Sequence, residues 1–189
     1  MIIGITGNSG SGKTTISNIL SQKLEYYLIN ADKIAKELAK KGNEYYNKIV
    51  QNFGKEILDN KEEIIRSKLA SIVYNNNEKM ETLNNLTNEY IVSEIKKQAL
   101  EKENAIIDVP RLIECGLSKI CDVVISVLAE ENIKIERICT RDGVSQSVAR
   151  ARLNIQAKDE FYIQNSDYII ENNGQNIDKE VESIIKNIK

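Results

Sequence analysis

The amino-acid sequence predicts an α/β fold of three layers, with a five-stranded parallel sheet between two layers of helices. Apolar runs of strand length alternate with helical segments, which is the pattern of βαβ units. A glycine-rich stretch joins the first of these strands directly to a helix. Residues 42–103 show helical periodicity without a strand signal, and arginines gather after the fourth strand. We therefore expect the core to carry a helical insertion and a basic lid.

The predicted elements follow from periodicity and from the residues that end each run. Apolar segments rich in β-branched residues predict strands at 1–6, 25–30, 104–110, 121–128 and 168–170. Helical spacing predicts core helices at 15–24, 33–40, 130–140, 146–156 and 177–188. Within the insertion, helical segments are expected at 43–50, 64–74 and 78–100, the last with a bend near Thr87.

The chain length suits one domain with an inserted segment, because 189 residues lie within the usual domain range. We expect a core of residues 1–41 and 104–189, an insertion of about 42–103, and a lid of about 141–166. The whole chain, 1–189, is then a single domain.

Composition excludes several classes of function. A formal net charge of −2 argues against a general nucleic-acid surface. No run approaches the roughly 18 apolar residues of a membrane span, and the N-terminus lacks the pattern of a signal peptide. We therefore expect a cytoplasmic protein without nucleic-acid or membrane partners. Three cysteines without a C-x-x-C pair indicate neither a disulfide framework nor a zinc site, and the lack of histidine excludes histidine chemistry.

The stretch 7–14, GNSGSGKT, matches the phosphate-binding motif G-x-x-x-x-G-K-[ST] between a strand and a helix. Backbone N–H groups of such a loop cradle phosphates, and the helix N-terminus adds a partial positive charge. Lys13 is expected to reach the β- and γ-phosphates, and the Thr14 hydroxyl to ligate Mg²⁺. The alternative is a glycine-rich turn that merely precedes a helix. The residues predicted to bind the nucleotide here are Asn8, Ser9, Gly10, Ser11, Gly12, Lys13, Thr14 and Thr15.

Two acids follow predicted strands at the sheet edge where open α/β sheets bind ligands. Asp32 follows the second strand, and either caps the next helix or acts catalytically. The two roles are compatible. Asp108 closes the third strand, and is either an acid of the Walker B type or a turn residue.

Basic residues are concentrated beyond the fourth strand. This set consists of Arg137, Arg141, Arg150, Arg152 and Lys158. Each one could simply belong to a solvated helical face. Together they predict a mobile basic lid, because phosphoryl transfer needs arginines around the transferred group and exclusion of water.

Several segments in their order along the chain resemble the dephospho-coenzyme A kinase family of small P-loop kinases. They are residues 3–7 with the loop, 29–35 (INADKIA), 53–54 with 66–74, 108–114 (DVPRLIE), 141–145 with 149–152, and 167–174 (DYIIENNG). The resemblance implies a P-loop kinase-like three-layer α/β/α fold. It also implies ATP-dependent phosphorylation of the ribose 3′-hydroxyl of dephospho-coenzyme A, giving coenzyme A and ADP, with ATP and Mg²⁺ bound.

The resemblance also implies roles for particular residues. Asp32 becomes the general base on the 3′-hydroxyl, and Arg141 a lid arginine on the transferred phosphate. Asn173 and Gly174 become part of the adenine pocket. The nucleotide is also expected to contact Arg137, and the acceptor to contact Asp108, Arg111 and Arg66. The metal is expected to bind Thr14 and Asp108.

The chain departs from the family pattern on the acceptor side, at Asn30, Asn88, Glu89, Arg111 and Tyr162. These departures favour, as an alternative, another small-metabolite or nucleoside kinase of the same fold. A non-catalytic nucleotide-binding regulator is a further alternative, against which the acids and Arg141 argue. We expect a monomer or a small homo-oligomer.

Overall fold

The computed structural model describes residues 1–74, 76–174 and 177–188. The chain divides into two compact units. The first unit comprises Met1–Asn30 and Ala99–Lys189, and the second comprises Ala31–Gln98.

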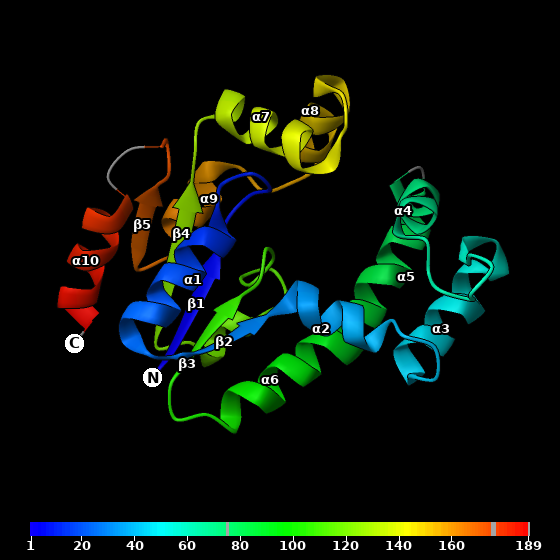
Figure 1. Cartoon of the computed structure of the whole chain (residues 1–189), viewed down its shortest axis with the longest axis horizontal. Helices are drawn as coiled ribbons and strands as arrows, with labels where there is room; N and C mark the ends of the chain where they lie inside the picture. Colours follow the sequence, from blue (N-terminus) through cyan, green and yellow to red (C-terminus); the bar gives the residue numbers. More distant parts are fainter. Residues whose placement is uncertain (75, 175–176, 189) are drawn as a thin grey trace. The chain divides into compact units, whose positions relative to one another are not determined.

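The first unit is built on a sheet of five parallel strands in the order β2-β3-β1-β4-β5 (Figure 1). The strands are β1 (Ile2–Thr6), β2 (Tyr27–Asn30), β3 (Ala105–Asp108), β4 (Val123–Leu128) and β5 (Tyr168–Glu171). In the register, Ile5 of β1 pairs with Asp108 of β3 and with Ile125 of β4. The ends of β1 and β3 therefore meet at one edge, and the predicted fold class is confirmed.

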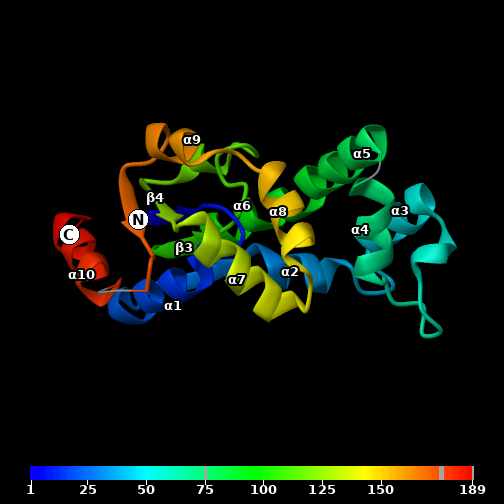
Figure 2. The same ribbon diagram turned by 90° about the horizontal axis from the view of Figure 1, so that it is seen from above.

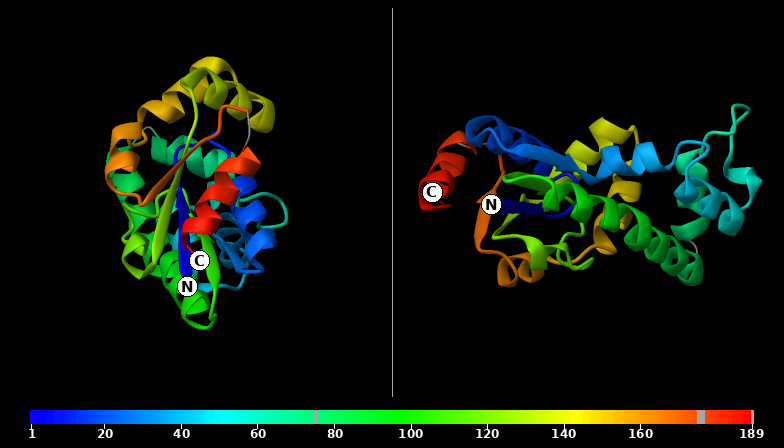
Figure 3. Two further views of the ribbon diagram at one scale, coloured as in Figure 1. Left: turned by 90° about the vertical axis from the view of Figure 1, so that its left-hand side faces the viewer. Right: turned by 90° about the horizontal axis from the view of Figure 1, so that it is seen from below.

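Helices cover both faces of this sheet, as Figures 2 and 3 show. Helices α1 (Lys13–Leu24) and α10 (Ile177–Ile188) pack together on one face. Helix α9 (Asp159–Gln164) lies on the other face, as seen in both views, and contacts β4. The short 3-10 helix η3 (Leu117–Ile120) contacts β1.

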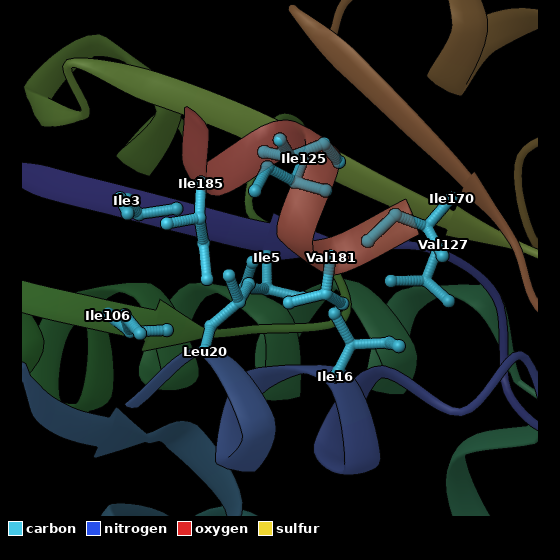
Figure 4. Packing of buried hydrophobic residues seen from close by; sticks show 11 residues of the cluster. Ile3, Ile5, Ile16, Leu20, Ile106, Ile125, Val127, Ile170, Val181 and Ile185 are labelled. Carbon is cyan, nitrogen blue, oxygen red and sulfur yellow. The ribbon is translucent and has the colours of Figure 1, made fainter. Parts of the chain in front are cut away.

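The core of this unit lies between the sheet and helices α1 and α10. Ile16 and Leu20 project from successive turns of α1 toward strand residues, and Val181 and Ile185 do so from α10 (Figure 4). Burying each such side chain stabilises the fold by about 1.5–3 kcal/mol relative to its exposure. This packing holds the start of α1, and hence the glycine-rich loop, against the sheet edge.

The region after β4 forms two helices with a small core of their own. Helices α7 (Glu131–Asp142) and α8 (Gln146–Asn154) pack through Ile135, Ile138 and Ala149. The Ser145 side chain accepts a hydrogen bond from the Val148 N–H, which caps the N-terminus of α8.

The second unit is helical. Its elements are α2 (Ala31–Leu38), α3 (Glu44–Phe53), the 3-10 helix η1 (Lys55–Ile57), α4 (Arg66–Tyr74), α5 (Asn77–Thr87) and the π-helix η2 (Asn88–Val92). Helix α6 (Ser93–Leu100) follows. The π-turn begins next to Thr87, where the sequence predicts a bend. The rings of Tyr45 and Tyr90 lie 5.8 Å apart, centroid to centroid.

Several local features differ from the sequence-based elements. Helix α2 begins at Ala31 and not at residue 33, so Asp32 lies within its first turn and not at its N-cap. Glu25, predicted to begin a strand, adopts a left-handed conformation with φ of 58° and ends α1. Helix α9 was not predicted, since its six residues are too few to show a helical period. Among the residues that the structure describes, none of the helices is both long and apolar enough to cross a membrane.

Candidate active site

The glycine-rich loop has the geometry of a phosphate-binding loop. Strand β1 ends at Thr6, the loop follows, and α1 begins at Lys13, so the helix N-terminus faces the end of the loop. The Lys13 amine is buried and donates to the Asn8 carbonyl at 2.9 Å. A lysine held across the loop in this way is already desolvated and positioned for an anion.

The two predicted metal ligands lie together at the edge of the sheet. Oδ2 of Asp108 accepts hydrogen bonds from Thr14 Oγ1 and Ser17 Oγ, each at 3.1 Å, and from Asn30 Nδ2 at 2.9 Å. Asp108 is only 3% exposed, and these donors offset the cost of burying its carboxylate.

A carboxylate beside a hydroxyl fits Mg²⁺, which takes oxygen ligands and usually binds one or two carboxylates together with phosphates and waters. Within the described residues there is no group of three or more cysteine or acidic side chains that could cage a metal. Thr14 and Asp108 together offer a hydroxyl and a carboxylate oxygen, which are donors that fit Mg²⁺.

Arg137, predicted to contact the nucleotide, lies against the loop. Its Nη1 donates to the carbonyls of Gly10 and Ser11, at 3.1 and 3.3 Å, and its Nη2 to Oδ1 of Asn172 at 3.3 Å. These contacts bring one positive charge to the phosphate-binding loop.

The segment after α8 is also tied to the loop. Oε1 of Gln156 accepts from the Ser9 N–H at 2.9 Å, and its Nε2 donates to Ser9 Oγ at 3.1 Å. The Asn8 side chain donates to the Ala157 carbonyl at 3.1 Å. The C-terminal end of the α7–α8 region is thus anchored on residues 8 and 9.

The predicted lid arginine has a carboxylate partner in the structure. Arg141 Nε and Nη2 donate to the two oxygens of Asp142 at 2.7 and 2.9 Å, and Arg152 Nη1 donates to Oδ2 at 2.7 Å. The hydrogen bond from Arg141, aided by Arg152, holds the pKa of the Asp142 carboxyl below its usual value.

The other predicted residues of this unit lie at the surface. Oδ1 of Asn173 accepts from the Glu130 N–H at 2.9 Å, immediately before α7. Gly174 has φ of +93°, and both residues are exposed. Thr15 and Arg111 are also exposed.

The second unit contains the two remaining predicted residues and a cavity. Asp32 is exposed in the first turn of α2, and Arg66 is the first residue of α4. Arg66 lines the cavity, whose volume is about 560 Å³. Its apolar lining includes Ala35, Ala39, Tyr45, Ile49, Leu69, Leu83 and Ile91, and its charged lining comprises Lys36, Lys40, Lys41, Lys61, Arg66 and the acid Glu63. Lys40 pairs with Glu37 and Lys41 with Glu62, so the excess positive charge of the lining comes mainly from Lys36, Lys61 and Arg66. Such a cavity suits a ligand with both an apolar arm and negative charge.

Comparison with known proteins places the chain in a family. The model of the dephospho-CoA kinase family matches residues 1–178. The chain belongs to this family. A dephospho-CoA kinase of Fusobacterium nucleatum is 35% identical, with 100% of this chain and 98% of that protein aligned. The dephospho-CoA kinase structure from Campylobacter jejuni has a TM-score of 0.67 and 29% identity, covering 99% of this chain and 96% of that one. A Thermus thermophilus protein shares the fold, with a TM-score of 0.81 and 23% identity, covering 100% of this chain and 95% of that one.

Four residues of the site in this family member were not predicted to act there. The hydroxyl groups of Ser17 and Thr14 donate to the same Asp108 oxygen. Ser17 follows Thr14 by about one helical turn, and this spacing is visible in the sequence. The sequence marks Asn30 only as a departure from the family pattern, and Gln156 only as the last residue of a predicted helix. Asn172 precedes the predicted Asn173, and its contact with residue 11 has no local signal in the sequence.

Proposed function

We propose that this chain transfers the γ-phosphoryl group of ATP to the ribose 3′-hydroxyl of dephospho-coenzyme A. Membership of the dephospho-CoA kinase family carries the proposal. The phosphate-binding loop and the contact between Thr14 and Asp108 support it, because together they offer sites for the donor phosphates and for Mg²⁺.

On the donor side, loop N–H groups and the α1 N-terminus bind the phosphates of ATP. Lys13 leaves the Asn8 carbonyl for the β- and γ-phosphates, and Arg141 exchanges Asp142 for the transferred group. Thr14 and Asp108 would hold Mg²⁺, which would supply positive charge against the phosphates. Asn173 and Gly174 contact the adenine.

On the acceptor side, Asp32 is the general base. Its carboxylate accepts the proton of the 3′-hydroxyl as that oxygen forms a bond to the γ-phosphorus. The bond from the γ-phosphorus to the β–γ bridging oxygen breaks, and ADP leaves. Lid closure excludes water, so that ATP is not hydrolysed instead.

The cavity of the second unit supplies acceptor specificity. Its apolar lining accommodates the pantetheine arm, and cations such as Arg66 pair with the acceptor's diphosphate. Adenosine lacks both the arm and the diphosphate, and is therefore a poor acceptor.

The experiment that tests this function identifies the product. The protein is incubated with ATP, Mg²⁺ and dephospho-coenzyme A, and the products are analysed by mass spectrometry and phosphorus NMR. We expect ADP and a single new phosphomonoester at the ribose 3′ position, in equal amounts. A phosphate on another hydroxyl, or turnover only with other acceptors, would indicate a different small-molecule kinase. Nucleotide binding without turnover on any acceptor would indicate a regulator.

A variant of the cavity tests the acceptor site separately. Arg66→Ala should raise KM for dephospho-coenzyme A about ten-fold or more, because hydrogen bonds to charged groups contribute about 1.5–3 kcal/mol, while KM for ATP stays unchanged. Lys79→Ala is the matched control, since Lys79 is an exposed cation of the same unit outside the cavity. An unchanged KM for dephospho-coenzyme A in Arg66→Ala would remove Arg66 from the acceptor site.

A further inference from the structure

A buried amide stands against the phosphate-binding loop at the glycine that precedes Lys13. Asn172 follows β5 and is 3% exposed. Its backbone N–H donates to the Leu128 carbonyl at 2.8 Å, which continues the pairing of β5 with β4. Its side-chain Nδ2 donates to the Ser11 carbonyl at 2.8 Å. The sheet thus anchors the side chain that contacts the loop.

Gly12 leaves the space that this amide occupies. A Cβ atom on Gly12 would overlap Nδ2 of Asn172, and the backbone there has φ of +94°. Glycine is therefore required at this position for two reasons, the left-handed backbone and the close approach of Asn172.

Arg137 contacts the oxygen of the same Asn172 side-chain amide. While Nδ2 of Asn172 donates to Ser11, its Oδ1 accepts from Arg137 Nη2 at 3.3 Å. Arg137 Nη1 also donates to the Ser11 carbonyl, at 3.3 Å. The position therefore needs a donor on one side and an acceptor on the other, which a side-chain amide supplies and a carboxylate does not.

These contacts fix the peptide group that joins Ser11 to Gly12. The described residues contain no cis peptide bond, and in a trans peptide the C=O and the N–H point in opposite directions. Holding the Ser11 carbonyl therefore sets the direction of the Gly12 N–H, which belongs to the loop that receives phosphate.

We propose that Asn172 is a positioning residue for phosphate recognition, which together with Arg137 presents the Gly12 N–H to the nucleotide phosphates. The inference rests on the proposed nucleotide site, and it differs from the adenine contact assigned to the neighbouring Asn173. A role on the phosphate side predicts an effect on ligands that have no adenine.

The test compares pyrophosphate with ATP as calorimetric probes of the full-length protein. Asn172→Asp keeps the shape and the acceptor toward Arg137 but sets an oxygen against the Ser11 carbonyl. We expect the Kd of pyrophosphate and the Kd of ATP each to rise about ten-fold or more, while the control Asn52→Ala, an exposed asparagine of α3, changes neither. Weaker ATP binding with unchanged pyrophosphate binding would overturn the proposal, since it would place Asn172 on the adenine.

Hydrogen exchange of the free protein gives a second readout that needs no ligand. The loop peptide covering residues 10–13 should exchange faster in Asn172→Asp than in wild type, while strands β1 and β3 keep their protection. Asn172→Ser serves for the same tests if the aspartate variant does not fold. Unchanged loop exchange in a folded variant would contradict the proposal. Failure of the wild type to bind pyrophosphate would instead count against the nucleotide site, and loop exchange would still decide the role of Asn172.

Discussion

At the scale of single residues, Lys13 carries the positive charge closest to the loop backbone. Lys13→Ala should lower kcat by about 10²–10³-fold or more, because charge in the transition state loses a preorganised partner. The melting temperature should stay close to that of the wild type. Lys23→Ala, in the last turn of the same helix and paired with Glu182, should leave kcat unchanged. A folded Lys13→Ala variant with wild-type kcat would remove the nucleotide from this loop.

The proposed role of Asp32 as the general base depends on its carboxylate charge. Asp32→Asn keeps the shape of an exposed side chain in the first turn of α2, so stability should change little, by less than about 1 kcal/mol. The kcat should fall by about 10²-fold or more, the contribution typical of a general base, with ATP affinity retained. Asp178→Asn, an exposed acid in the first turn of α10, is the matched control. Normal turnover in Asp32→Asn would move the role of base to Asp108.

At the scale of elements, helices α7 and α8 carry the arginines that the family resemblance assigns to a lid. Arg141→Ala should lower kcat by on the order of 10³-fold if Arg141 stabilises the transferred group. Steady-state kinetics with ATP varied decide the point. A loss confined to KM would show that Arg141 binds the ground state and the transition state equally and gives the transferred group no extra stabilisation.

The ion pairs of Asp142 make part of the stability of α7 and α8 depend on pH. Because Arg141 lowers the folded-state pKa of Asp142, this contribution is complete above the ordinary carboxyl pKa of about 3.9. It is lost as pH falls through the lower, folded-state value. Wild type should therefore be more stable than Asp142→Asn at pH 7, by up to about 1 kcal/mol for a surface pair, and the difference should be smaller at about pH 3, below the ordinary carboxyl pKa. Thermal melts of both proteins at the two pH values measure this, and a constant difference would exclude the pairs as its cause.

The sequence could predict the elements that local signals mark. The loop between β1 and α1 is specified by consecutive residues, so its motif, its helix and the role of Lys13 could all be proposed together. Contacts between distant residues have no such signal. Asn172 lies 161 residues from Ser11, and the two come together because β4 pairs with both β1 and β5. The same limit applies to Gln156 and Ser9, which are 147 residues apart.

At the scale of the whole molecule, the parallel sheet and its helices could be predicted because strand and helix signals alternate along the core. The strand order could not, since β3 pairs between β1 and β2 although the entire insertion separates β2 from it in sequence. The second unit was predictable as helical, whereas its cavity arises from side chains of four separate helices and from the η2 turn.

The measurement of acceptor selectivity compares dephospho-coenzyme A with adenosine at saturating ATP. Binding energy from the pantetheine arm and diphosphate should be used in the transition state, so that truncation lowers kcat as well as raising KM. We expect kcat/KM for dephospho-coenzyme A to exceed that for adenosine by about 10²-fold or more. Equal values of kcat/KM for the two acceptors would contradict the assignment of this chain as a kinase acting on dephospho-coenzyme A.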